Sequence, residues 1–127
     1  MTVEVVLKIA GTSFRFDNLV AVHLAISVDK KPVVLTLEPD PENQFDENAV
    51  KVMASIDGKE PINVGFIPRS DSKRANDAIR EGRVKAVSVA ECYIGGGGKR
   101  YGTMSIKLTV EKKGESSKST MESKSNV

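Results

Sequence analysis

The chain has 127 residues, of which 39% are hydrophobic and only 5% aromatic, so its length suits one domain with a mainly aliphatic core. Residues 1–111 carry 15 Lys and Arg against 15 Asp and Glu, so the net charge of +2 comes from residues 112–127, and this balance argues against a nonspecific polyanion binder held by bulk charge. A single cysteine excludes a disulfide framework and a Cys-based zinc site. No apolar run is long enough to span a membrane, and the N-terminal segment does not resemble a secretory signal. We therefore expect a cytoplasmic protein with no membrane partner.

The first half of the chain predicts strands separated by polar loops. Residues 3–11 are rich in Val and Ile and stop at Gly11, which is typical of a strand. Residues 12–18, TSFRFDN, are predicted to form a polar loop that carries two phenylalanines. Residues 20–28 alternate larger with smaller side chains, which predicts a strand, although the alanines would also suit a short helix. After a DKKP turn, residues 33–38 predict a strand that enters an acidic loop.

The second half predicts four more strands and the clearest helix. Strands are expected at 49–55, 62–68, 83–94 and 101–110, and GGGGKR at 95–100 forms the hairpin tip between the last two. The helix covers residues 70–82, with Ser70 or Ser72 as its cap and Gly82 at its end. Six or seven short strands and one main helix predict a mainly β, α+β domain over residues 1–111, built as a small, partly open β-barrel. Residues 112–127 are predicted to be a disordered polar tail.

The acidic loop allows two interpretations from its residues alone. Residues 38–47 hold five acids and no Lys or Arg, and Phe45 stands beside Asp46 in their midst. Carboxylates such as Asp40, Glu42 and Asp46 suit magnesium or calcium, but the spacing of a calcium-binding loop is absent. In the other interpretation, Asp46 and Asn48 shape the turn by hydrogen bonds from side chain to backbone, and the remaining acids are solvated.

Other candidate groups are less specific. The glycine run is not a nucleotide-binding loop, because Lys99 is followed by Arg100 and then by a strand; both could contact phosphate from a mobile hairpin. His23, the only histidine, is expected on the outer face of a strand, and Cys92 is expected to be a small, buried or half-buried side chain rather than a nucleophile.

Three separated motifs resemble the HIRAN domain family. IAGTSF is similar to that family's opening VxGxSF, DPENQFDENAVKV to its E-P-D-N-P-Y-D-P-N-A-[VI]-x-V signature, and NVGFIPRSDS to the V-G-[YH]-[IV]-P-[RK]-E segment that leads into a helix. The match covers about residues 4–93, and YGTMSIKL fits the closing strand. The resemblance, to a free-standing bacterial or phage type and to the N-terminal domain of helicase-like transcription factor, implies a modified oligonucleotide-binding (OB-like) barrel that captures the 3′-hydroxyl end of single-stranded DNA.

Carried over residue by residue, the resemblance gives roles to three side chains. Phe14 matches a ring that stacks on a base, and Phe45 matches a tyrosine that stacks on the terminal nucleotide. Asp46 matches an aspartate that accepts a hydrogen bond from the 3′-hydroxyl. The chain departs from the eukaryotic pattern at Ser13, which replaces an arginine, and at Phe66, which replaces a histidine near the terminal sugar.

We therefore expect a noncatalytic module that binds single-stranded DNA or DNA 3′ ends without cofactor or metal, in the setting of DNA repair or replication proteins. Phosphates would be met by Arg69 and Lys73 at the helix start, where free backbone N–H groups favour anions, and by Arg15. Two alternatives stay open. One is a metal-dependent nuclease or hydrolase that uses the acidic loop, and the other is a protein-interaction adaptor that uses the tail or an open sheet edge.

Overall fold

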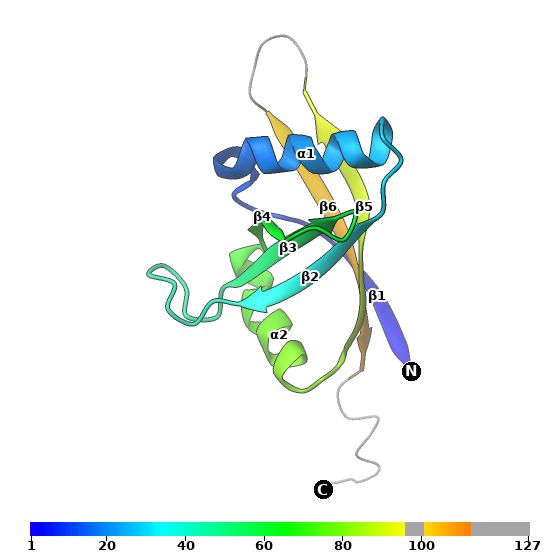
Figure 1. Ribbon diagram of the computed structural model, residues 1–127. Helices are drawn as coiled ribbons and strands as arrows, with labels where there is room; N and C mark the ends of the chain where they lie inside the picture. Colours follow the sequence, from blue (N-terminus) through cyan, green and yellow to red (C-terminus); the bar gives the residue numbers. More distant parts are fainter. Residues whose placement is uncertain (96–100, 113–127) are drawn as a thin grey trace, which may run out of the picture.

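The computed structural model describes residues 1–95 and 101–112, which form an α+β fold (Figure 1). Within these ranges lie two α-helices, one short 3₁₀ helix and six strands. In chain order they are β1 (Thr2–Lys8), η1 (Thr12–Arg15), α1 (Phe16–Ser27), β2 (Val33–Pro39), β3 (Val50–Ile56), β4 (Ile62–Phe66), α2 (Arg69–Arg80), β5 (Val84–Ile94) and β6 (Gly102–Glu111).

The strands form two antiparallel sheets of three strands each, ordered β1-β6-β5 and β2-β3-β4. Within the described ranges both sheets are open, and they do not join into a closed barrel. They meet at one isolated bridge between Ala10 and Phe66, where each backbone N–H donates to the facing carbonyl, at 2.8 and 2.9 Å. Gly65 makes this contact possible, because a Cβ at that position would lie 2.6 Å from the carbonyl oxygen of Ala10.

The strand predicted at residues 20–28 is wrong, because this segment belongs to α1. The buried residues of α1 are Leu19, Val22 and Ala25, which recur every three residues and so share one face of a helix. The alternation over residues 20–28 predicted a strand, but it started after Leu19 and so missed the spacing of three that marks the buried face of the helix. Consequently the fold has two main helices rather than one, and α1 lies across the sheet that contains β5 and β6 (Figure 1).

Helix α2 confirms the predicted helix, but its first turn differs from expectation. The helix begins after Pro68, and neither Ser70 nor Ser72 makes a capping hydrogen bond. Its C-terminal end follows the prediction: Gly82 has a φ of +70°, its N–H donates to the carbonyl of Ile79, and the N–H of Arg83 donates to the carbonyl of Ala78. These two bonds satisfy carbonyls that the helix leaves without partners.

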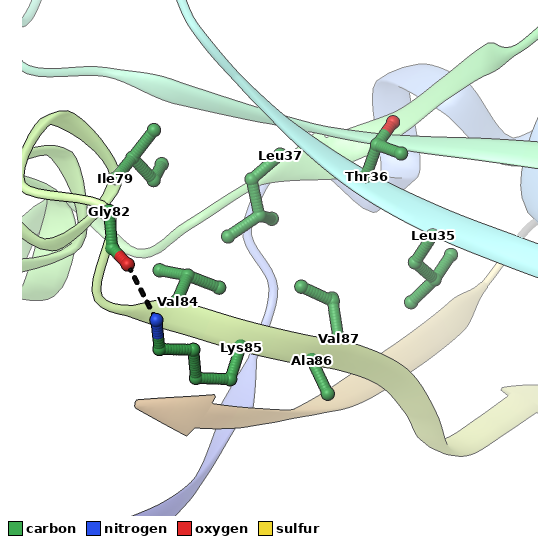
Figure 2. Close-up of a pocket in the computed structure, with 9 residues that line it drawn as sticks. All are labelled: Leu35, Thr36, Leu37, Ile79, Gly82, Val84, Lys85, Ala86 and Val87. Carbon is green, nitrogen blue, oxygen red and sulfur yellow. Dashed lines mark hydrogen bonds between the residues drawn. The ribbon is translucent and has the colours of Figure 1, made fainter. Parts of the chain in front are cut away.

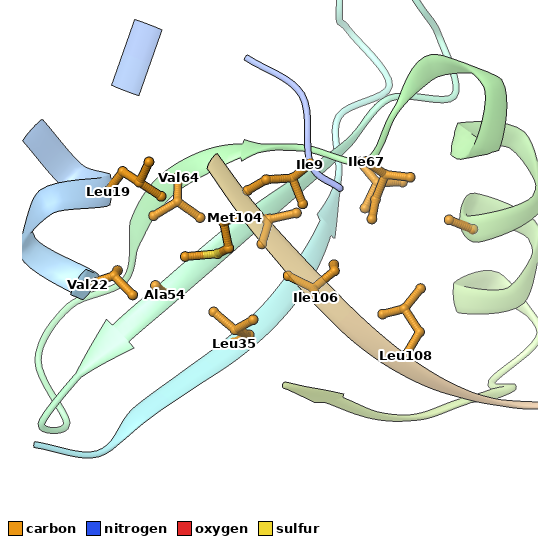
Figure 3. Close-up of a cluster of buried hydrophobic side chains, with 13 residues drawn as sticks. Ile9, Leu19, Val22, Leu35, Ala54, Val64, Ile67, Met104, Ile106 and Leu108 are labelled. Atoms are coloured by element: carbon orange, nitrogen blue, oxygen red, sulfur yellow. The ribbon is translucent and has the colours of Figure 1, made fainter. Parts of the chain in front are cut away.

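The core is aliphatic, as the low aromatic content predicts, and lies between the two sheets (Figure 3). Met104, Ile106 and Leu108 alternate along β6 and are almost fully buried. Figure 3 shows Leu19 and Val22 of α1 at one end of this cluster, and Leu108 lies toward α2 at the other. The two helices therefore cover opposite ends of one core.

Some expectations fall outside the described residues. The predicted hairpin tip, with Lys99 and Arg100, lies there, and so does the predicted tail beyond Lys112. Over the part of the chain that the structure describes, no helix is both long and apolar enough to cross a membrane.

Candidate nucleic-acid interface

The loop between β2 and β3, residues 40–48, is built around the side chain of Asn43. Its Oδ1 accepts hydrogen bonds from the backbone N–H groups of Phe45 (2.9 Å) and Asp46 (3.1 Å), and its Nδ2 donates to Oδ2 of Asp40 (3.3 Å). The base of the loop is closed by the N–H of Asp40, which donates to the carbonyl of Ala49 at 2.8 Å. This frame leaves the ring of Phe45 80% exposed.

Asp46 is held as a charged acceptor by neutral donors. Its Oδ2 accepts from the hydroxyl of Ser72 at 2.6 Å, and its Oδ1 accepts from the N–H of Asn48 at 2.9 Å. These two bonds, helped by the positive charge of Arg69 and opposed by partial desolvation, lower the pKa of Asp46 below its ordinary value of 3.8. An ionised carboxylate offers about four acceptor positions, so the half-buried group retains capacity for a ligand hydroxyl.

Two buried polar side chains of α2 fix this loop against the helix. Ser72 is 3% exposed and holds Asp46, while Asn76 is 7% exposed and donates from Nδ2 to the carbonyl of Asn48 at 3.3 Å. Arg80 donates from Nε to Oδ1 of Asn76 at 3.0 Å and so orients that amide. Sequence reasoning missed both roles; the available signal was a pair of polar residues spaced i, i+4 on the buried face of a predicted helix.

The second exposed ring, Phe14, belongs to η1. It is 83% exposed, and η1 is anchored by the hydroxyl of Thr12, which donates to the carbonyl of Gly102 at 2.9 Å. The bridge at Ala10 ties the same segment to the end of β4, from which the chain enters α2. These contacts connect Phe14 to the helix start, and η1 and the 40–48 loop project on the same side of Figure 1. Phe66 itself is partly buried, so its ring offers less surface for stacking than the exposed ring of Phe14.

The predicted basic residues are less available than their number suggests. Lys73 pairs with Asp77 at 3.1 Å, Arg80 pairs with the same aspartate, and Arg74 pairs with Asp71. Arg69 is exposed and forms no ion pair within 4.0 Å among residues 1–95 and 101–112. Arg69 is therefore the candidate phosphate contact near the loop whose charge is not already paired on the helix.

Arg15, at the end of η1, donates from Nη1 to the carbonyl of its neighbour Phe14 at 3.4 Å. This is a weak local contact, since the distance lies at the long end of the hydrogen-bond range. The partly exposed guanidinium, next to Phe14 in the chain, therefore remains a candidate phosphate contact.

Two further rings went unnoticed in the sequence. Tyr93 and Tyr101, each about half exposed, lie edge to face with ring centroids 6.4 Å apart. Tyr101 precedes Gly102, whose carbonyl anchors η1, so these rings stand near the Phe14 segment. Alternation along a strand places a tyrosine on one face but does not reveal which tyrosines meet across the hairpin.

The only histidine and cysteine meet in a structural contact. His23 lies on α1, not on the predicted strand, and its Nδ1 is 3.4 Å from the carbonyl oxygen of Cys92. Burial raises the pKa of the half-buried Cys92 thiol to about 11, so the reactive thiolate is scarce near neutral pH.

No described part of the chain gathers three or more His, Cys, Asp or Glu side chains in a way that could hold a metal ion. Two clefts lie outside the 40–48 loop, since no loop residue lines either of them. One of about 420 Å³ opens between β2 and β5 and is lined mainly by aliphatic side chains, with Lys85 donating to the carbonyl of Gly82 at 3.1 Å (Figure 2). It lacks the convergent polar groups that define most small-molecule sites.

Comparison of the chain with models of known protein families, with curated proteins and with solved structures finds no match. The functional interpretation therefore rests on the residues and contacts themselves. Those contacts bring Phe45, Asp46, Ser72 and Arg69 together at the start of α2.

Proposed function

We propose that this chain is a noncatalytic module that binds single-stranded DNA and captures its free 3′-hydroxyl end. The observation that carries the proposal is the pairing of an exposed ring, Phe45, with the adjacent carboxylate of Asp46, which neutral donors keep ionised. The ring supplies a stacking surface for the terminal base, and the carboxylate accepts the hydrogen bond of the terminal hydroxyl. Neither role needs a metal or a cofactor.

The charge around the site favours an end over the interior of a strand. The loop contributes Asp40, Glu42, Asp46 and Glu47, so a phosphate placed beside Asp46 would be repelled. A terminal hydroxyl carries no such charge and donates a hydrogen bond instead. Arg69, at the helix start, can meet the phosphate that precedes the terminal nucleotide, where the helix N-terminus also attracts an anion.

The arrangement of the sheets supports an open barrel of the oligonucleotide-binding type. The bridge at Ala10–Phe66 joins the two sheets on one side, and the edges of β2 and β5 stand across a cleft on the other. The first and third HIRAN-like motifs contain the bridge residues Ala10 and Phe66. These two motifs also contain Phe14 and the start of α2, and the second motif forms most of the 40–48 loop. A single, half-buried thiol agrees with a reducing, cytoplasmic setting alongside DNA repair or replication proteins.

The proposal is tested by fluorescence anisotropy with oligonucleotides of one sequence that end in a 3′-hydroxyl or a 3′-phosphate. We expect the 3′-phosphate to weaken binding at least about tenfold, because it replaces a donor by a charge beside Asp46. Asp46→Asn should lose this preference, whereas Glu47→Gln, which neutralises the neighbouring exposed acid, should keep it. Equal binding of both oligonucleotides to the unaltered chain would overturn end capture.

The same samples, incubated with magnesium or manganese, address the nuclease alternative. Under the proposal the DNA stays intact. An oligonucleotide product that disappears in Asp46→Asn would instead assign the acidic loop to catalysis.

A further inference from the structure

Within residues 1–95 and 101–112, the first strand presents an unpaired backbone edge. The N–H of Ile9 donates to Met104 of β6, and the N–H of Lys112 donates to Met1, so the odd-numbered residues of β1 bond to β6. In an antiparallel ladder the alternate residues point the other way. Glu4, Val6 and Lys8 therefore direct their backbone N–H and carbonyl groups to the free edge of the sheet, where Figure 1 shows β1 as the outermost strand.

This edge differs from the other three edges of the described sheets. Edge strands are usually protected against pairing by bulges, prolines or short length. The ladder of β5 has two irregularities, β2 ends in Pro39, and β4 has five residues with a bulge opposite it. By contrast, β1 has seven residues in unbroken register and contains neither Pro nor Gly. Its outer face also exposes Val6, which is 61% accessible.

The sequence of β1 is complementary to itself in one antiparallel register. When Val6 stands opposite Val6 of a second copy, Glu4 stands opposite Lys8 at both ends, and every edge-directed residue from 4 to 8 finds a backbone partner. The adjacent registers place Val6 opposite Glu4 or opposite Lys8 and lose both charge pairs. The registers beyond them place Glu4 opposite Glu4 or Lys8 opposite Lys8, which costs free energy. On the same face, Glu4 also pairs with Lys107 of its own chain at 3.8 Å, an exposed ion pair that contributes little.

The inner side of the same strand adds apolar surface. A groove of about 360 Å³ lies between β1 and α2 and is lined by Val3, Val5 and Leu7 on the strand side. In the self-complementary register, Val5 of one copy lies opposite Leu7 of the other, on this inner face. Pairing would therefore place aliphatic side chains beside each groove while the charged pairs stay on the outer face.

We propose that β1 is a homodimerisation edge, at which two copies of this chain pair antiparallel about Val6 and join their sheets into one six-stranded sheet. The pairing forms backbone hydrogen bonds at positions 4, 6 and 8 and two Glu4–Lys8 pairs between the copies. One strand pair buries less than the roughly 1,200–2,000 Å² of a stable interface, so the dimer is weak and depends on concentration.

Sedimentation velocity of the full chain, from the micromolar to the millimolar range, tests this proposal. We expect a monomer–dimer equilibrium that Lys8→Glu weakens at least about tenfold, because two opposite-charge pairs become like-charge pairs. The double variant Glu4→Lys with Lys8→Glu exchanges the charges and should restore dimerisation. Lys59→Glu makes the same charge change in the turn before β4, away from the edge, and should leave the equilibrium unchanged.

A backbone variant tests the same edge independently of charge. Val6→Pro removes the edge-directed N–H without removing a hydrogen bond to β6, a position where proline is tolerated, and it should abolish the dimer while circular dichroism stays native. A chain that remains monomeric throughout the concentration range would overturn the proposal. So would a dimer that Lys8→Glu and the exchanged double variant affect alike.

Discussion

The acidic 40–48 loop and the basic helix α2 are the two most charged regions around the site, and they handle charge in opposite ways. In the loop, Asp46 is satisfied by a hydroxyl and a backbone N–H, so its negative charge is kept. In the helix, Lys73 and Arg80 share Asp77, and Arg74 pairs with Asp71. Most of the positive charge is therefore paired with carboxylates of the same helix.

The contrast between the loop and the helix shows that the number of charged residues in a segment does not predict how much unpaired charge it presents to a ligand. A helix start with several cations suggests a phosphate clamp, yet its cations are paired at i, i+3 and i+4. The loop, which suggests repulsion of DNA, instead offers an oriented acceptor and an exposed ring. This arrangement of charge favours the proposed capture of a chain end over binding along a phosphate backbone.

The largest expected effect comes from breaking the junction that positions both regions. Gly65→Ala would place a Cβ 2.6 Å from the carbonyl oxygen of Ala10, at a residue whose φ is +156°. We expect the free energy of unfolding, measured in urea, to fall by about 2–5 kcal/mol. Gly58→Ala is the matched control: its φ is +74° with nothing within 4 Å of the added Cβ, and about 1 kcal/mol is expected. Equal losses would show that the contact with Ala10 is not essential.

The second-largest expected effect is a loss of DNA affinity when the exposed ring of the loop is removed. Phe45→Ala should weaken binding of single-stranded DNA by about 5- to 150-fold, the range that corresponds to one lost base–aromatic stack. Stability should stay unchanged, because the ring is 80% exposed. Val34→Ala, which trims an apolar side chain 59% exposed on β2, serves as control and should leave anisotropy titrations as they are. Unchanged affinity in Phe45→Ala would remove the ring from the binding surface.

A smaller effect comes from releasing the charge of the helix. Asp77→Asn removes the carboxylate shared by Lys73 and Arg80, so the dependence of log affinity on log salt should steepen by up to about 0.7 for each cation that then meets a phosphate. Glu91→Gln removes one negative charge from the exposed side of β5 and should leave that slope unaltered. If both variants give the same slope, net charge rather than helix pairing controls binding.

The smallest expected effect is that of pH. The pKa of Asp46 is lowered below 3.8, so its carboxylate stays ionised from neutral pH down to that value. A preference for a 3′-hydroxyl over a 3′-deoxy end, measured on thymidine oligonucleotides, should be constant over this range and decline only below it. The sign is the same for folding: the contribution of Asp46 is present above 3.8 and is lost as pH falls through the folded-state value. A preference that changes near pH 6 would point to another titrating group.

Much of the fold was predictable because its patterns are local. Alternation at Met104, Ile106 and Leu108 identified β6, and Gly82 identified the end of α2. The segment of α1 was misassigned, because larger side chains alternate over residues 20–28 as in a strand, while Leu19, Val22 and Ala25 recur every three residues as in a helix. Only packing against the sheet decides between the two periods.

In the candidate site, too, the local contacts were predictable from the sequence and the long-range contacts were not. The turn at Asp46 and Asn48 was predicted, since that bond spans two residues. Its second partner, Ser72, lies 26 positions away and was expected to cap the helix instead, because no local pattern specifies a contact made by folding.

The proposed hydrogen bond from the terminal hydroxyl to the carboxylate of Asp46 is tested most directly by a four-way comparison. The unaltered chain and Asp46→Asn are each titrated with a 3′-hydroxyl and a 3′-deoxy oligonucleotide, which differ by one oxygen and no charge. We expect the unaltered chain to prefer the hydroxyl end by about tenfold, the strength of a hydrogen bond to a charged acceptor, and Asp46→Asn to show almost no preference. The same preference in both proteins would show that Asp46 does not bind the terminal hydroxyl.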